Sequence, residues 1–133
     1  MKRDGWYYIL APAGGVADGW QTVLRSRSIY GPYESRRVLE SGDTGINGPH
    51  QGGLVDTPDG KEWWFMHFQS KGIHGRVVHL QPARWTDDGW IEMGDKGHPV
   101  LTYRRPNVGE DGASVRMQMS DDFSDADPGL QWQ

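Results

Sequence analysis

Residues 47–53 read N-G-P-H-Q-G-G and place a histidine, His50, between a proline and two glycines. A neutral imidazole can ligate a cation or hold an ordered water through one ring nitrogen, while its other nitrogen needs a partner. Glycines beside it allow a second chain segment to approach closely. The spacing by itself favours a turn histidine bonded to the backbone, with a ligand-binding histidine as the alternative.

Three further side chains carry groups that can bind a polar or ring-shaped ligand. The guanidinium of Arg76 donates hydrogen bonds in a planar fork that suits vicinal hydroxyls or a carboxylate. Trp20 offers a flat face for a sugar ring, and the amide of Gln21 can bond a hydroxyl. From residue type alone, Arg76 is more simply a surface arginine at a strand start, and Trp20 a packing residue.

The paired acids do not indicate catalysis. Each pair lies in a predicted turn or tail, where carboxylates commonly bond the local backbone; the pairs are Asp87 with Asp88, Asp121 with Asp122, and Asp125 with Asp127. No metal-binding spacing links the remaining histidines, which are His67, His74, His79 and His98. We expect His67 and His79, which alternate within strands, to be core or interface groups with satisfied hydrogen bonds.

The composition is that of one modest domain rich in turns and aromatic residues. The chain has 133 residues, with 19 glycines, 8 prolines and 7 tryptophans. A net charge of −4 with scattered cations predicts no nucleic-acid partner. The absence of cysteine excludes disulfides and cysteine-ligated zinc. No apolar run reaches the length of a membrane span, and the N-terminal apolar run is too short for a signal peptide, which leaves the compartment unknown.

Short apolar runs rich in aromatic and β-branched residues, bounded by Gly, Pro, Asp and Asn, predict strands to position these side chains. No stretch shows a helical period over three turns. We expect strands near 5–12, 20–28, 33–38, 51–57, 62–69, 76–85 and 89–93, with further strands near 99–104 and 113–119.

Two aromatic runs, 6–10 and 63–68, carry apolar residues on both faces, which predicts strands buried between layers or within propeller blades. The motif D-G-W-Y-Y at 4–8 returns loosely as D-G-K-E-W-W at 59–64, and an offset of roughly 55 residues is in the range of propeller blades. The second unit has an innermost strand over 50–58, whereas the first has no counterpart. We therefore count one four-stranded blade and three strands of another.

These motifs resemble a known family. The runs G-P-H-Q-G-G-L-V-D-T-P-D-G-K-E-W-W-F-M-H-F and H-G-R-V-V-H-L-Q-P-A-R-W-T-D-D-G-W resemble the last blades of glycoside hydrolase family 43, which comprises β-xylosidases and α-L-arabinofuranosidases. The resemblance implies an all-β chain, part of a five-bladed β-propeller. Residues 1–94 would be its last two blades, 95–119 a linker with extra strands, and 120–133 the beginning of a C-terminal β-sandwich.

The resemblance also implies an active site at one end of the propeller axis, where two Asp and one Glu hydrolyse a glycoside with inversion. All three acids correspond to positions upstream of Met1, so we expect the isolated chain to be inactive. His50 would face the central channel and bind calcium, another cation or water there. Arg76 would reach the sugar hydroxyls and the acids, and the loop over the site mouth would contribute Gly14, Gly15, Trp20 and Gln21.

The function implied is that of a segment of an inverting exo-glycosidase that removes xylose or arabinose units from plant hemicellulose. Its ligands would be xylo- or arabino-oligosaccharides, with no cofactor beyond the channel ion. The alternatives are a non-catalytic carbohydrate-binding fragment and a self-associating one. Two isolated blades would expose apolar faces at both ends, which predicts a homo-oligomer through these faces or poor solubility.

Overall fold

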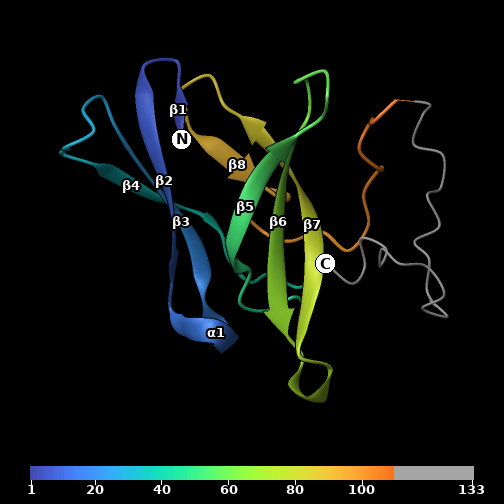
Figure 1. Ribbon diagram of the computed structural model, residues 1–133. Helices are drawn as coiled ribbons and strands as arrows, with labels where there is room; N and C mark the ends of the chain where they lie inside the picture. The colour runs from blue at the N-terminus through green and yellow to red at the C-terminus, as the bar shows by residue number, and fades with distance from the viewer. Residues whose placement is uncertain (110–133) are drawn as a thin grey trace, which may run out of the picture.

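The computed structural model describes residues 1–109 as two antiparallel four-stranded sheets (Figure 1). The first sheet has the order β1 (Lys2–Arg3), β2 (Trp6–Ala13), β3 (Trp20–Ser26), β4 (Glu34–Leu39). The second has the order β5 (His50–Asp56), β6 (Trp63–Ser70), β7 (Arg76–Trp85), β8 (Ile91–Met93). Helix α1 (Gly15–Asp18) joins β2 to β3, and the 3-10 turn η1 (Gly72–His74) joins β6 to β7. Within these residues no helix has the length and apolar character needed to cross a membrane.

This architecture confirms the predicted all-β fold and the partial propeller, with the two aromatic runs as interior strands β2 and β6. The first sheet differs from the prediction of three strands. A turn at Asp4 and Gly5, both with positive φ, folds the chain back so that Lys2 pairs with Tyr7 and Arg3 with Trp6. This short fourth strand gives both sheets the same four-strand pattern.

The prediction of a strand near 99–104 was wrong, because these residues form no strand. Instead of pairing with a strand, the backbone of Val100 pairs with one side chain: its N–H donates to Gln81 Oε1 at 2.7 Å, and its carbonyl accepts from Gln81 Nε2 at 3.1 Å. Two predicted segments lie outside the described residues, namely the strand near 113–119 and the β-sandwich start at 120–133.

The hydrophobic core lies between the two sheets, where β2 lies against β5 and β4 against β8. Its buried members are Tyr8, Val23, Val38, Leu39, Phe65, Trp90, Ile91 and Met93. Tyr8 also ties the sheets together, because its hydroxyl donates to the Gly89 carbonyl at 2.6 Å. Burying each large apolar side chain contributes roughly 1.5–3 kcal/mol, so this shared core fixes how one sheet sits on the other.

A nearly buried arginine reinforces the contact between the sheets. The guanidinium of Arg25 lies between two indoles, 4.4 Å from the ring centre of Trp6 and 4.1 Å from that of Trp90. Its Nη1 donates to the Asp88 carbonyl at 2.6 Å, and its Nη2 pairs with Glu34 at 3.1 Å. Since Trp6 belongs to the first sheet and Trp90 directly precedes β8 of the second, this stack helps to fix the relative orientation of the sheets.

Strands β2 and β6 were expected to be buried on both faces, but their outward faces are partly exposed. Ile9 on β2 and Met66 on β6 are each 46% exposed, because each sheet packs against only one other within the described residues. The apolar residues on the outward faces of these strands are therefore not covered by the described residues.

Candidate functional site

The predicted site residues gather at one end of the sheets, where α1 and the β6–β7 connection lie together at the bottom of Figure 1. A shallow pocket of about 250 Å³ opens there, between the β2–β3 loop of the first sheet and the start of β5. Its lining residues are Pro12, Ala13, Gly15, Val16, His50 and Gln51. The loop glycine and the histidine predicted from sequence thus share one cavity.

His50 is 3% exposed and has a defined proton position. Its Nδ1 lies 2.7 Å from the carbonyl oxygen of Gly48, and a carbonyl can only accept, so Nδ1 carries the hydrogen. The Nε2 atom is then left with a lone pair for a ligand or a water. Both alternatives raised by the sequence are therefore compatible: the ring is held by the backbone and retains one ligating nitrogen.

A β-bulge explains the two glycines after His50. His50 pairs with Phe68 and Gly53 with Met66, so β5 has one extra residue over this interval. Gln51 adopts a positive φ of 56°, and a Cβ on Gly52 would lie 2.1 Å from the Met66 carbonyl oxygen. Only a glycine allows β5 to approach β6 this closely beside His50.

Gln21 supports the bulge from the first sheet. Its Oε1 accepts from the N–H of Gln51 at 3.0 Å, and its Nε2 donates to the Thr22 carbonyl at 3.1 Å. The residue is 0% exposed. In this conformation Gln21 positions Gln51 and does not itself reach the pocket, in contrast to the direct hydroxyl contact expected from sequence.

The two loop glycines have different tasks. Gly14 has a φ of 82°, and a Cβ there would lie 2.4 Å from the Trp20 ring, so this glycine lets the loop fold onto the indole. Arg37 covers the same indole, with its guanidinium 4.0 Å from the ring centre. Gly15, with a φ of 83° and open space around it, lines the pocket. Trp20 thus lies beneath the loop, half-buried, and packs against these neighbours.

Phe68 brings His50 and Arg76 together. Its ring centre lies 5.7 Å from that of His50, and the exposed Arg76 guanidinium lies 4.4 Å from the same ring centre. Strands β5, β6 and β7 each contribute one of these residues, at neighbouring positions near one end of the sheet. The phenyl ring was not recognised as a site residue from sequence, although its place opposite His50 follows from pairing the two strands.

A partly buried polar network lies behind this pocket. His79 Nε2 donates to Gln69 Oε1 at 3.2 Å, and Gln69 Nε2 donates to the Gly45 carbonyl at 2.8 Å and to Asn47 Oδ1. Asn47 in turn donates to the Ala17 carbonyl in α1 at 2.7 Å. This chain of bonds connects β6 and β7 to the β2–β3 loop, and so fixes the pocket walls relative to one another.

His67 is the most perturbed group in residues 1–109. It is 2% exposed, with its ring stacked between those of Phe65 at 5.8 Å and His79 at 5.4 Å. Burial, with a smaller contribution from the nearby histidines, lowers the pKa of His67 to about 4. Its Nδ1 donates to the Phe68 carbonyl at 3.2 Å, but its Nε2 has no partner among the described residues. We expected both histidines to have satisfied hydrogen bonds. His79 is bonded to Gln69, whereas His67 is bonded through only one of its two ring nitrogens.

The described residues do not by themselves fit a calcium site. Ca²⁺ takes six to eight oxygen ligands, whereas His50 offers one nitrogen and no acid lines its pocket. Among residues 1–109 no cluster of three or more His, Asp or Glu side chains could hold a metal ion.

Comparison with known proteins identifies the family of this chain. Residues 1–91 match the model of glycosyl hydrolases family 43. The whole chain is 59% identical to 26% of a Xylanibacter ruminicola protein named provisionally as a β-xylosidase. A xylosidase/arabinosidase of Humicola insolens is 33% identical over 83% of this chain and 23% of its own length.

The fold comparison agrees with the sequence comparisons. The crystal structure of a family 43 protein of Bacillus licheniformis, BlXynB, superimposes with a TM-score of 0.71 and 31% identity, over 82% of this chain and 24% of that one. The chain therefore spans about a quarter of the length of the curated relatives that it matches.

Proposed function

The chain belongs to glycosyl hydrolases family 43, and we propose that it forms part of the sugar-binding wall of an inverting exo-glycosidase that removes xylose or arabinose units from plant hemicellulose. The observation that carries this proposal is the convergence of His50 and Arg76 on the ring of Phe68, beside the glycine loop. The names of the relatives, which include xylosidase and arabinosidase, supply the substrate class.

Each residue has a distinct task in this proposal. The exposed Arg76 fork donates to sugar hydroxyls and is held in place by its contact with Phe68. His50, fixed by Gly48, presents Nε2 to an ordered water or to a cation whose oxygen ligands come from outside the described residues. Gly15 keeps the pocket open, while Gln21 positions Gln51 at its rim. Trp20 remains a proposed sugar contact through its uncovered surface.

Removing the Arg76 fork should weaken sugar binding. We expect Arg76→Met to lower the affinity for xylo- and arabino-oligosaccharides about tenfold, because hydrogen bonds to a charged donor contribute roughly 1.5–3 kcal/mol. The shift of the His50 ring protons during an NMR titration measures this binding locally.

Arg36→Met is the matched control for this substitution. Arg36 also lays an exposed guanidinium over an aromatic ring, 4.5 Å from the centre of Trp90, but it lies on β4. The proposal fails if both variants bind the sugars with the affinity of the parent. It also fails if no sugar shifts the His50 signals.

A second candidate function is non-catalytic carbohydrate binding, which is favoured by the lack of an acid among the described residues that line the pocket. Turnover of nitrophenyl β-xyloside and α-L-arabinofuranoside separates the two functions. We propose that this chain alone gives no turnover and that a longer polypeptide carrying the family's three acids does. A longer polypeptide that binds sugar without turnover would favour the second function.

We also propose that a second copy of this chain covers the outer face of the second sheet. Four apolar side chains share this face and are 40–62% exposed: Val55, Met66, Val78 and Leu80. Contiguous apolar surface that solvent reaches favours association. The same sheet packs its other face against the first sheet, and within residues 1–109 these four side chains of the outer face remain accessible to a partner.

Charges placed on this face should dissociate the dimer. We expect the double variant Met66→Glu with Leu80→Glu to shift light scattering at high concentration from dimer to monomer, because a dimer would bury two carboxylates per chain. Ile73→Glu, at a loop tip that is 98% exposed, is expected to leave the dimer intact. A parent chain that stays monomeric at every concentration would contradict this assignment.

A further inference from the structure

A groove crosses the two sheets at the end opposite His50, and we call it the distal groove. It consists of three adjoining pockets of about 390, 450 and 510 Å³. The first shares Arg3 and Trp85 with the third, and shares Arg84 and Tyr103 with the second. The cavities therefore adjoin one another from the β1–β2 turn to the segment after β8.

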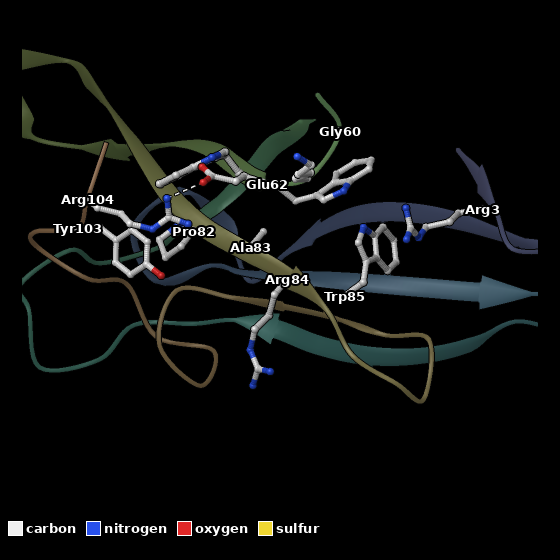
Figure 2. A pocket seen from close by; sticks show the side chains of 12 residues that line it. Arg3, Gly60, Glu62, Pro82, Ala83, Arg84, Trp85, Tyr103 and Arg104 are labelled. Atoms are coloured by element: carbon white, nitrogen blue, oxygen red, sulfur yellow. Dashed lines mark hydrogen bonds and ion pairs between the residues drawn. The ribbon is translucent and has the colours of Figure 1, made fainter. Parts of the chain in front are cut away.

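Aromatic rings form the apolar part of the groove. Figure 2 shows its central pocket, where Trp85 stands beside Arg3 and Tyr103 flanks the other side. The rings of Trp63 and Trp85 meet edge to face at 5.7 Å, and Tyr103 is 57% exposed. The aliphatic lining of this pocket is confined to Pro82 and Ala83. Flat rings with little aliphatic surface suit the C–H faces of sugar rings better than apolar chains.

The charges around the groove balance in number, because six basic and six acidic side chains line the three pockets. Arg104 pairs with Glu62, as Figure 2 shows by a dashed line, and Arg84 pairs with Glu92 at 2.8 Å. Arg104 lowers the pKa of Glu62, so this carboxylate stays ionised and accepts hydrogen bonds. Compensated cations do not favour a phosphate backbone, which binds through uncompensated ones. Alternating donors and acceptors instead match hydroxyl groups, which donate and accept at once.

Arg3 connects the aromatic and the charged parts. Its guanidinium lies 4.8 Å from the ring centre of Trp85 and 5.6 Å from that of Trp63, and it pairs with Asp4 at 3.2 Å. Its side chain is 37% exposed, and an exposed ion pair holds it only weakly. Arg3 can therefore turn toward a hydroxyl and leave the indole face to a sugar ring.

We propose that the distal groove binds a neutral oligosaccharide, with sugar rings on Trp63, Trp85 and Tyr103 and hydroxyls bridging the arginine–carboxylate pairs. Three adjoining pockets, each of a size that takes a small ligand, suit a chain of several sugars rather than one. The choice of xylose or arabinose as the sugar rests on the proposed function, whereas the groove itself needs no catalytic acid. Such a site would hold a polymer at a second point on the molecule.

Titration with xylohexaose tests the proposal through tryptophan indole signals in ¹H–¹⁵N spectra. The indole signals of Trp63 and Trp85 are expected to shift as the sugar is added. Tyr103→Ala should weaken this response about fivefold, because an aromatic contact is lost. Tyr30→Ala, which removes a ring that is 96% exposed on another loop, should leave the response unchanged.

Three outcomes would overturn the proposal. They are indole signals of Trp63 and Trp85 that stay fixed, a response that Tyr103→Ala leaves unaltered, and a response to acidic oligosaccharides with none to neutral ones. His50 ring signals that shift while these indoles stay fixed would reject the distal groove and still support the proposed function. The two sites are therefore tested separately in one experiment.

Discussion

Lowering the pH from about 7 to about 4 is expected to remove roughly 3 kcal/mol from the free energy of unfolding, through the single side chain of His67. Burial lowers the pKa of His67 to about 4, against an ordinary value of 6.5. Between these two values the unfolded chain binds a proton at His67 that the folded chain does not. Stability is therefore complete above the unfolded pKa and falls as the pH drops toward the folded one.

The environment of His67 explains why protonation is so costly. Its Nε2 is buried without an acceptor among the described residues, and the ring lies on that of His79, whose own pKa burial also lowers. His50 adds a third ring that repels a proton on His67. Because burial also lowers the pKa of His79, its protonation further reduces the free energy of unfolding as the pH falls.

Urea unfolding followed by tryptophan fluorescence at several pH values measures this effect. We expect His67→Phe to unfold with a weaker pH dependence than the parent, and to exceed it in stability at about pH 4, because the variant has no proton to exclude. His74→Phe, which replaces an exposed histidine in η1, should follow the parent curve. Identical pH dependences for His67→Phe and the parent would contradict the assignment.

Surface carboxylates act in a separate pH range. Hydrogen bonds from Thr57, Arg104 and Thr86 lower the pKa values of three acids, Asp59, Glu62 and Asp88 respectively. Their contribution is present above the ordinary carboxyl pKa and is lost as the pH falls through the lowered values. The loss expected from His67 therefore begins at a higher pH than the loss expected from these three acids.

The sequence predicted the long strands well because their signals are local. Aromatic runs between turn residues place β2 and β6 within a residue or two of their observed bounds, and the 4–8 and 59–64 repeat identifies two blades. Shorter elements escape the same signals. Helix α1 has four residues and η1 has three, too few to show a period, and β1 exists only through its pairing with β2.

The site was predicted less completely because its geometry depends on long-range contacts. His50 and Arg76 were selected by motif, but the phenyl ring of Phe68 that joins them becomes evident only when β5 and β7 are paired with β6. The buried amide of Gln21 shows why: the family resemblance implied a sugar contact, whereas the fold uses both of its polar atoms internally. The distal groove likewise joins residues from both sheets that no local motif connects.

Replacing Gly52 by alanine should cost about 3 kcal/mol of unfolding free energy, at the upper end of the effect of overpacking. The new methyl group would lie 2.1 Å from the Met66 carbonyl oxygen and 2.5 Å from the Phe65 ring. A backbone atom cannot give way as a flexible side chain can, so β5 must move away from β6. His50, two residues earlier, would move with the bulge and lose its position against Phe68.

The adjacent glycine provides the control. A Cβ on Gly53 meets nothing within 4 Å, and Gly53 lacks the positive φ that disfavours other residues. Gly53→Ala should therefore change stability by no more than about 0.5 kcal/mol. Urea unfolding in dilute solution measures both variants, and the His50 ring signals show whether the site is displaced. Equal losses for the two substitutions would mean that general flexibility, rather than close approach of β5 to β6, requires these glycines beside His50.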